Sequence, residues 1–270
     1  MIELETFISQ LKDKSISIAV YDLQTQKEIL IHADELMHPA STMKVPVTME
    51  VFRQAHVGLL ALDERLKIFN SFKSIVDGSE FSLDAADDSE GTLYERIGET
   101  ESIHELTRLM IVRSSNLAAN LLMEKVGTTH VDEFIKELGI MDMTVIRGLE
   151  DKKAYRLDIN NSASARSSTT MMRLIAEGKV ISKQACAEMI QIMLGQEFNE
   201  SIPALLPSSA KVAHKTGWSG SFFHDTGIVF PQNRKPYAIT LFTHGFPEGN
   251  ENEAHACMAQ ISKIIYEEII

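Results

Sequence analysis

Apolar residues recur at helical spacing at both ends of the chain, and each end is expected to form an amphipathic helix. The first helix covers residues 3–13 and the second covers residues 251–270. The apolar positions that define them are Leu4, Phe7, Ile8 and Leu11 in the first, and Ala254, Met258, Ile261, Ile265 and Ile269 in the second. One apolar face on each helix requires a surface to pack on.

That surface is expected to be a β-sheet. Residues 15–23 and 27–32 are alternating, β-branched runs separated by a short polar turn, which predicts an antiparallel hairpin. Three further strand-like runs occur only near the other end of the chain, at residues 211–217, 227–230 and 237–243. The sequence between the two sets is largely helical in its spacing.

This order of elements predicts an α+β fold in a single domain, residues 1–270. The N-terminal hairpin joins the C-terminal strands in a five-stranded antiparallel sheet, flanked by the terminal helices. Residues 1–40 and 206–270 then form an α/β subdomain, and residues 41–205 form an all-α subdomain. Ligand sites favour such junctions, so the active site is expected in the cleft between the subdomains.

Composition narrows the range of partners. The 270 residues are 44% hydrophobic and 24% charged, which suits a globular protein with a sizeable core. The net charge of −12, from 26 Lys and Arg against 38 Asp and Glu, opposes binding to nucleic acid and to anionic lipid. No apolar run reaches membrane-spanning length. Nucleic acid is therefore not expected as a partner, and the oligomeric state is left open.

Two further expectations concern location and cofactors. Residues 1–5 lack the basic and apolar regions of a secretory signal peptide, so the chain as given is expected in the cytoplasm, with export by another route left open. Cys186 and Cys257 are expected to be buried thiols. The nine histidines show no metal-binding spacing, so neither metal nor cofactor is expected and hydrolytic chemistry would use a side-chain nucleophile.

One internal segment has an unusual charge. Residues 77–105 contain ten acidic residues and one arginine, Arg96, with glycines between them. Such a segment is usually a solvated surface loop, and that is the prediction here. The alternative is an insertion that gates a substrate.

Three short motifs occur in an order that suits a nucleophilic serine site. The first, Ser41-Thr42-Met43-Lys44, opens an apolar helical run, so Ser41 is expected near a helix N-terminus that favours a developing negative charge. Lys44 lies on the same helix face and can reach the Ser41 hydroxyl, and as a base it needs a lowered pKa. Ser-x-x-Lys also occurs at Ser9 and Ser208, so the motif alone is not specific. The alternative is an N-capping serine with a snorkelling lysine.

The second motif, Ser114-Ser115-Asn116, lies between two buried helical segments. Ser114 can relay a proton between Lys44 and a leaving group. Asn116 can hold Lys44 or bind a substrate amide. A plain helix cap is the alternative.

The third motif, Lys215-Thr216-Gly217, ends a strand-like run. Lys215 would present a fixed cation that suits an anionic substrate, and Gly217 would let the substrate approach the backbone closely. If Trp218 continues an edge strand, its backbone N–H and that of Ser41 can form an oxyanion hole. A surface strand end is the alternative.

Together these motifs resemble those of the penicillin-recognising serine hydrolases, and of class A β-lactamases in particular. The resemblance spans nearly the whole chain, and its most specific part is residues 114–122, which are similar to the family's Ser-Asp-Asn helix with Ser115 in place of the aspartate. It implies a β-lactamase/transpeptidase-like fold with the site between its two parts. The implied catalytic residues include Ser41, Lys44 and Ser114, and the implied substrate-binding residues are Asn116, Lys215, Thr216, Gly217 and Trp218.

The resemblance also implies a glutamate on an omega loop, which activates the water that hydrolyses the acyl-enzyme. At the family's spacing from Ser114 this residue is Glu150, in a polar, glycine-containing segment. A surface glutamate is the alternative.

The sequence departs from the family pattern at three places. Ala154 stands where the family has an asparagine that helps hold the water, and Asp151 stands where it has a proline. Thr226 occupies a position that is often cationic, which leaves the substrate carboxylate to Lys215, Thr216 and His224.

Three functions follow from this interpretation. In the first, Ser41 attacks the strained cyclic amide of a β-lactam, with Lys44, or Glu150 through water, as base, and Ser114 returns the proton to the ring nitrogen. Water activated by Glu150 then releases the product. The second function is a D,D-peptidase or esterase in which Glu150 is structural. The third is a sensor that captures β-lactams or peptidoglycan without turnover.

Overall fold

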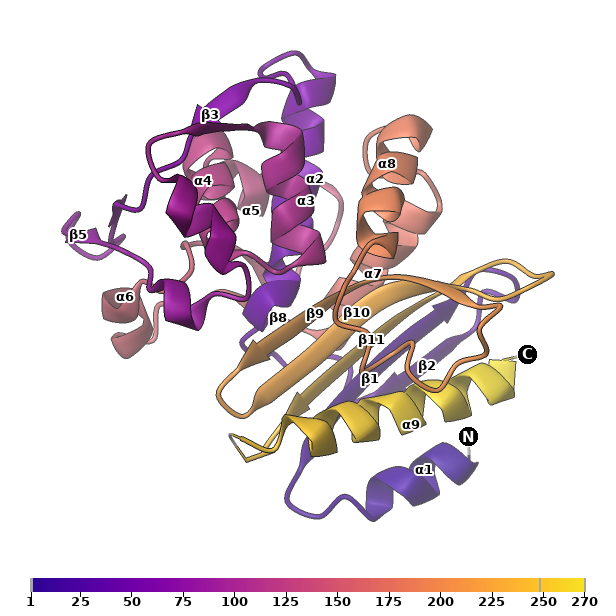
Figure 1. Ribbon diagram of the computed structural model, residues 1–270. Coiled ribbons are helices and arrows are strands. Elements are labelled where there is room, and N and C mark those ends of the chain that lie inside the picture. The colour runs from indigo at the N-terminus through magenta and orange to yellow at the C-terminus, as the bar shows by residue number, and fades with distance from the viewer. Residues whose placement is uncertain (1, 248, 270) are drawn as a thin grey trace.

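A computed structural model describes residues 2–247 and 249–269 (Figure 1). The α-helices are α1 Ile2–Ser9, α2 Lys44–His56, α3 Ile103–Val112, α4 Asn116–Val126, α5 Thr128–Glu137, α6 Lys152–Arg156, α7 Ala165–Ala176, α8 Lys183–Leu194 and α9 Glu251–Ile269. The strands are β1 Ser15–Asp22, β2 Glu28–Ile31, β3 Arg65–Lys67, β4 Phe72–Lys73, β5 Glu80–Phe81, β6 Thr100–Ser102, β7 Met143–Thr144, β8 Ser162–Ala163, β9 Lys211–Ser219, β10 Phe222–Phe230 and β11 Tyr237–His244. The 3₁₀ helices are η1 Ala40–Met43, η2 Ala85–Asp87 and η3 Gly91–Arg96.

The predicted five-stranded antiparallel sheet is confirmed, in the order β2-β1-β11-β10-β9. The N-terminal hairpin joins the C-terminal strands through β1 and β11, which pair over their whole length from Ser15 opposite His244 to Asp22 opposite Tyr237. Strand β9 is therefore an edge strand, which pairs with β10 alone among the described strands.

Strand β10 is longer than predicted. It begins at Phe222, not at residue 227, and β9 continues to Ser219, so the two strands pair from Phe222 opposite Ser219 onward. The turn between them contains Gly220 with φ +56°. Residues 222–226, two adjacent phenylalanines followed by three polar residues, carry no alternating apolar signal, so only the pairing with neighbouring strands reveals this part of the ladder.

Each face of the sheet is covered by helices. On β1, the side chains of Ile16, Ile18 and Val20 belong to one core with α9 residues such as Ile261. On the opposite face, Ala19 packs against Ala165 at the start of α7. Figure 1 shows α1 and α9 together below the sheet, with α7 and α8 on its other side.

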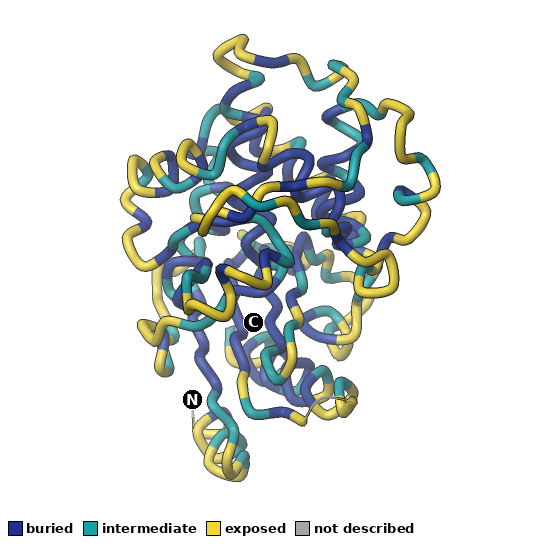
Figure 2. The backbone as a smooth tube through the Cα atoms, turned by 90° about the vertical axis from the view of Figure 1, so that its left-hand side faces the viewer, coloured by how far each residue is buried: buried dark blue, intermediate teal, exposed yellow. Residues whose placement is uncertain are grey.

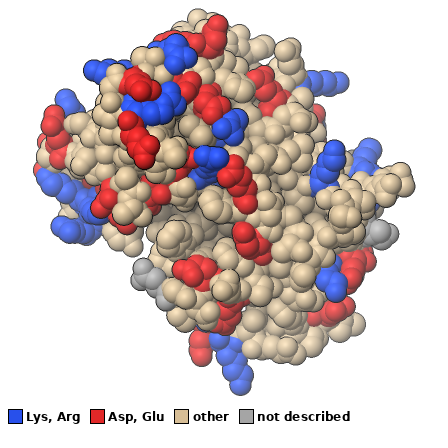
Figure 3. All heavy atoms as spheres, in the orientation of Figure 1, with Lys and Arg blue, Asp and Glu red and all other residues tan. Residues whose placement is uncertain are grey.

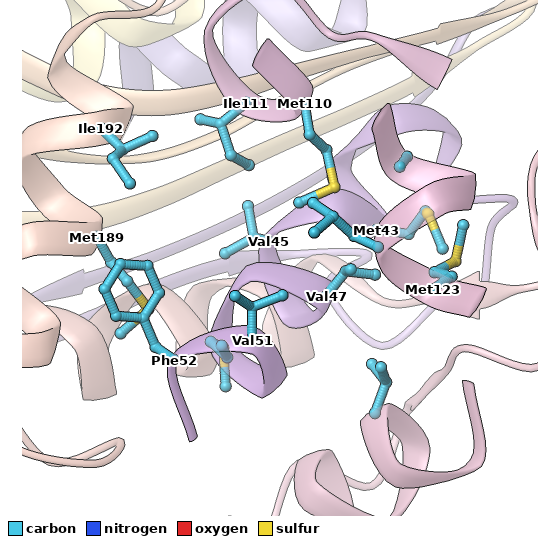
Figure 4. Close-up of a cluster of buried hydrophobic side chains, with 14 of the residues drawn as sticks. Met43, Val45, Val47, Val51, Phe52, Met110, Ile111, Met123, Met189 and Ile192 are labelled. Atoms are coloured by element: carbon cyan, nitrogen blue, oxygen red, sulfur yellow. The ribbon is translucent and has the colours of Figure 1, made fainter. Parts of the chain in front are cut away.

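The remaining helices surround a second core that includes α2. Figure 4 shows Val45, Val47, Val51 and Phe52 of α2 among residues from α3, α4 and α8. Pro46 is the third residue of α2, where its missing N–H removes no intrahelical bond. Three short two-stranded sheets, β3 with β6, β4 with β5 and β7 with β8, interrupt the largely helical middle of the chain.

The two predicted terminal helices are both present, although α1 ends at Ser9 rather than at residue 13. The predicted end of α9, residue 270, lies outside the described residues. Figure 2 shows the chain buried through the centre of the molecule and exposed along loops and the outer faces of these helices. Cys186 and Cys257 are buried free thiols, as predicted. Across the described helices, none is long and apolar enough to cross a membrane.

Candidate active site

Ser41 lies in η1, the short helical turn that leads directly into α2. Neither η1 nor α2 is capped by a side chain, so Ser41 is not the N-capping serine of the alternative interpretation. The residue before it, Ala40, has φ +47°, an unfavourable value for a residue with a Cβ atom. Non-glycine residues are held in this region only where surrounding contacts impose it, and they concentrate at functional sites.

The edge strand β9 approaches the backbone of η1 closely at Gly217. A Cβ atom on Gly217 would lie 3.0 Å from Ser41 N and 3.1 Å from Thr42 N, so a glycine is required for this contact. Trp218 follows within the same edge strand, as the oxyanion-hole prediction requires, and its side chain is 56% exposed. The backbone N–H groups of Ser41 and Trp218 are thus brought to neighbouring parts of one surface.

Lys44 is completely buried at the start of α2, so it does not snorkel to solvent. Its Nζ donates to Ser114 O at 2.7 Å, to Asn116 Oδ1 at 2.7 Å and to Ser114 Oγ at 3.3 Å. Among the described residues, Lys44 Nζ makes no hydrogen bond with the Ser41 hydroxyl. The second motif therefore holds the amine.

Burial lowers the pKa of Lys44 to about 7, while the carboxylates of Asp88 and Glu150 act in the opposite direction. A large fraction of the amine is then neutral near pH 7, as a general base requires. Lys215 is buried as well, and desolvation together with the nearby Lys44 charge lowers its pKa well below the ordinary value. Lys215 is thus less of a fixed cation than the sequence predicted.

Ser114 lies between the two lysines. Lys215 Nζ donates to Ser114 Oγ at 3.0 Å and to Thr216 O at 2.8 Å. Ser114 has φ +57°, and it occupies the short connection between α3 and α4. The helix-cap alternative is correct for Ser115, whose Oγ accepts from Ala118 N at 3.1 Å, but not for Ser114 and Asn116, which contact Lys44.

Glu150 is half-buried, with φ +60°, in the loop that precedes α6. Asn116 Nδ2 donates to Glu150 Oε1 at 2.9 Å, so one carboxamide joins Lys44 to Glu150. Burial raises the pKa of Glu150, and the Asn116 hydrogen bond opposes that shift. The predicted surface-glutamate alternative is therefore incompatible with its position.

The loop that carries Glu150 is fixed by α4. Asn120 Nδ2 donates to Leu149 O at 3.0 Å, and Leu149 N donates to Asn120 Oδ1 at 2.8 Å. A Cβ atom on Gly148 would lie 2.9 Å from that same Oδ1, which explains the glycine. The backbone of this loop is thus held on both sides of Leu149.

Asp151, which replaces the family's proline, is a structural residue that sequence reasoning missed. Its carboxylate accepts from Ser74 Oγ at 2.9 Å, from Ile75 N at 3.0 Å and from Ala154 N at 3.1 Å. It therefore caps α6 and attaches the loop to the segment that contains β4 and β5. Ala154 is fully buried and has no amide group to hold a water beside Glu150.

His224 lines the cleft, and Thr226 lies two residues further along the same strand, β10. Burial lowers the pKa of His224 to about 4. Its Nε2 lies 2.9 Å from His38 O, and its Nδ1 lies 2.8 Å from Phe223 O and 3.2 Å from Thr243 N. The neutral ring thus supports the turn that precedes Ser41. Thr226 is buried against Thr240, with 2.7 Å between their hydroxyl oxygens.

The prediction of a solvated loop for residues 77–105 is wrong in part. Residues 86–89 line the cleft, and Glu90 is buried in an ion pair with Arg113, whose Nη1 lies 2.8 Å from Glu90 Oε2. The charge pattern alone did not show this, because the partners of these acids lie far away in sequence.

These groups surround a cleft of about 620 Å³. Its lining includes Ser41, Ser114, Asn116, Glu150, Thr216, Gly217 and Trp218. The surface is hollowed between the helical part and the sheet, toward the left of the view in Figure 3. Within residues 2–247 and 249–269, no group of three or more His, Cys, Asp or Glu side chains is arranged to hold a metal ion. A hydroxyl, a neutral amine and a half-buried carboxylate are suited to acyl transfer.

Comparison with known proteins agrees with this geometry. Residues 3–269 match the model of the beta-lactamase enzyme family. Beta-lactamase BRO-1 of Moraxella catarrhalis is 26% identical over 231 residues, which cover 81% of this chain and 70% of the relative. The extended-spectrum beta-lactamase PER-1 of Pseudomonas aeruginosa is 23% identical over 274 residues, covering 95% and 83%.

Among solved structures, PBP-A superposes with a TM-score of 0.83 at 22% identity, covering 99% of this chain and 94% of that one. At this identity the superposition shows the shared fold. The resemblance to the class A serine β-lactamases is thus confirmed, and the chain belongs to the beta-lactamase enzyme family.

Proposed function

We propose that this protein hydrolyses β-lactams through an acyl-enzyme on Ser41. The observation that carries the proposal is the single network in which Asn116 joins the buried Lys44 amine to Glu150 while Ser114 joins Lys44 to Lys215. Membership of the beta-lactamase enzyme family supports the reaction class.

In the acylation step, Ser41 Oγ attacks the lactam carbonyl carbon and its proton passes to a base. Lys44 fits this role because its pKa is about 7, and Glu150 through a water is the competing base. The backbone N–H groups of Ser41 and Trp218 would stabilise the oxyanion. When the carbon–nitrogen bond breaks, Ser114 Oγ delivers the proton from Lys44 to the ring nitrogen.

In the deacylation step, Glu150 takes a proton from a water that attacks the ester carbonyl. The ester carbon–oxygen bond then breaks, and the proton returns from Glu150 to the leaving Ser41 oxygen. Asn116 holds the carboxylate beside the cleft for this purpose. Ala154 supplies no second hydrogen bond to that water, so we expect deacylation to be slower than acylation.

The first prediction is tested with the purified full chain and a chromogenic cephalosporin. The wild type should turn over many equivalents, whereas Ser41→Ala should lower kcat/KM by at least about 10³-fold, since the nucleophile is lost. Ser9→Ala, at an unrelated Ser-x-x-Lys match, is the matched control and should retain the wild-type rate. Undiminished activity in Ser41→Ala would contradict the proposal.

A second candidate function is favoured by one observation, the alanine at position 154 next to the Glu150 site. Slow deacylation is typical of a D,D-peptidase, esterase or sensor rather than of a lactamase. PBP-A, a structural neighbour, has a variant described as an acyl-enzyme complex with penicillin G. Time-resolved intact mass with benzylpenicillin separates the candidates: a lasting penicilloyl adduct supports the second, and rapid return to the free mass supports hydrolysis.

A further inference from the structure

The acidic segment before α3 contacts the Ser114-Ser115-Asn116 motif directly. Asp88 Oδ2 accepts from Asn116 N at 2.8 Å and from Leu117 N at 2.9 Å. The same oxygen accepts from Tyr94 OH at 2.9 Å and lies 3.5 Å from Ser115 Oγ. The Asp88 carboxylate therefore contacts the start of α4, which lies 28 residues further along the chain.

With this carboxylate, the free N–H groups at the start of α4 are all satisfied. Asp88 takes those of Asn116 and Leu117, Ser115 Oγ takes that of Ala118, and Ser115 N donates to Leu109 O at 3.2 Å. A negative charge at this place also interacts favourably with the helix dipole. Ser115 alone, with one hydroxyl, could not have accepted from three amides.

We propose that Asp88 is a positioning residue, whose carboxylate caps α4 in place of the aspartate that Ser115 replaces and so holds Asn116 between Lys44 and Glu150. The inference rests on the proposed function of the Ser41 site. Its physical basis is that the Asn116 backbone sets where the Asn116 carboxamide lies, and this carboxamide contacts both Lys44 and Glu150.

A second contact from the same segment supports this role. Glu90, two residues after Asp88, is buried and pairs with Arg113, the residue directly before Ser114. The acidic segment therefore holds the motif on both sides. This contact gives a physical reason for buried acids within a segment whose composition suggests a solvated loop.

The test moves the carboxylate from position 88 to position 115. Since Ser115 Oγ lies 3.5 Å from Asp88 Oδ2, an aspartate at 115 can occupy nearly the same place. The variants are Asp88→Asn, Ser115→Asp and the double variant Asp88→Asn/Ser115→Asp. Glu95→Gln, which removes one charge from an exposed side chain of the same segment, is the control. Acylation by benzylpenicillin is followed by intact mass, together with the unfolding midpoint.

Asp88→Asn is expected to acylate about 10- to 100-fold more slowly, and the double variant to recover at least tenfold. Ser115→Asp alone should be slower than the double variant, because two carboxylates would then lie side by side. Glu95→Gln should match the wild type. Wild-type acylation in Asp88→Asn would overturn the inference, as would a double variant that regains its unfolding midpoint without regaining acylation.

The pH profile separates positioning from plain stability. Lys44 faces the Asp88 and Glu150 carboxylates and the Lys215 amine, and the Asp88 charge raises its pKa. Removing that charge should move the rising limb of the acylation rate to lower pH, and Ser115→Asp in the double variant should move it back. An unmoved limb in Asp88→Asn would overturn the inference.

Failure of the proposed function is distinguishable. If the wild type forms no adduct, the proposed function fails, and the cap is then tested by amide hydrogen exchange. Exchange at Asn116 and Leu117 should be faster in Asp88→Asn than in the wild type, and unchanged exchange would overturn the inference.

Discussion

At the scale of single residues, the site depends on two lysines that are buried close to each other. Lys44 and Lys215 are both buried, and each contacts Ser114 Oγ. The charge on Lys44 disfavours the charge on Lys215, so the two amines are not both protonated at low cost. The lowered pKa of both lysines favours a neutral amine beside Ser114 Oγ.

The pH dependence of acylation distinguishes the two candidate bases. If Lys44 is the base, the acylation rate should rise with pH through about 7 and level off above it, because the amine must lose its proton. If Glu150 is the base, the limb should follow the Glu150 carboxylate, whose pKa burial raises, and should disappear in Glu150→Gln.

The measurement is the single-turnover rate with benzylpenicillin between about pH 5 and 9, a range centred on the pKa of Lys44. Glu150→Gln provides the control: a rising acylation limb should remain, moved to lower pH because the Glu150 charge raises the pKa of Lys44, and its acyl-enzyme should persist. A rate that does not change with pH in Glu150→Gln would exclude Lys44.

At the scale of elements, the site is formed by loops and helix N-termini whose backbone geometry is fixed by contacts with other elements. Three non-glycine residues at the site have positive φ: Ala40, which precedes Ser41, and the site residues Ser114 and Glu150. Contacts from other elements hold them there, including the Gly217 approach to η1 and the Asn120 contact with the Glu150 loop. Such strain persists only where surrounding structure over-determines the backbone.

Asp151 tests this dependence on outside contacts. Asp151→Asn should lower the free energy of unfolding by about 1–2 kcal/mol, because the buried Ser74 hydroxyl and the Ile75 N–H lose a charged acceptor. Deacylation should slow more than acylation, since the loop carries Glu150 but not Ser41 or Lys44. Chemical denaturation and intact mass report the two effects.

The matched control is Asp158→Asn, in an exposed position just after α6, where φ is +57° and asparagine is well tolerated. It should leave both quantities close to wild type. Equal effects in the two variants would contradict the role given to Asp151.

At the scale of the whole molecule, the cleft lies where two cores meet across one sheet. Phe242 and Ala238 of β11 belong to the helical core, whereas Ile239 and Leu241 of the same strand belong to the core beneath α9. Alternate residues of a strand face opposite sides, so β11 couples the two cores. On the face in Figure 3, acidic and basic side chains are interspersed, so the net charge of −12 produces no single acidic surface there.

Loss of packing beneath α9 should therefore affect stability more than chemistry. Ile261→Ala should lower the free energy of unfolding by about 2–5 kcal/mol, because Ile261 is fully buried and a cavity would remain. The acylation rate of the folded protein should be unchanged, since Ile261 is not among the residues that line the cleft. Denaturant unfolding measures the free energy of unfolding, and single-turnover mass measurement gives the acylation rate.

Glu267→Ala, on the exposed side of α9, is the control and should change stability by less than about 0.5 kcal/mol. A large loss of acylation in folded Ile261→Ala would show that the two cores are coupled more tightly than the structure indicates.

The sequence alone determined whatever local periodicity and short motifs encode. The terminal helices, the N-terminal hairpin and the positions of the three motifs were all predictable, because each depends on residues within a few positions of one another. The family resemblance added Glu150, which no local pattern could have identified. The extent of β10 was not predictable, since its first residues pair with β9 and β11 without an alternating apolar signal.

Only the tertiary structure decided which side chains meet. The Lys44 amine is held by the second motif, the His224 ring is neutral and already engaged, and Asp88 caps a helix 28 residues away. Each of these contacts joins residues that are distant in sequence, so it forms only when packing has closed the intervening chain. Burial then sets the pKa of Lys44 and Glu150, because desolvation is a property of the folded surroundings and not of the residue.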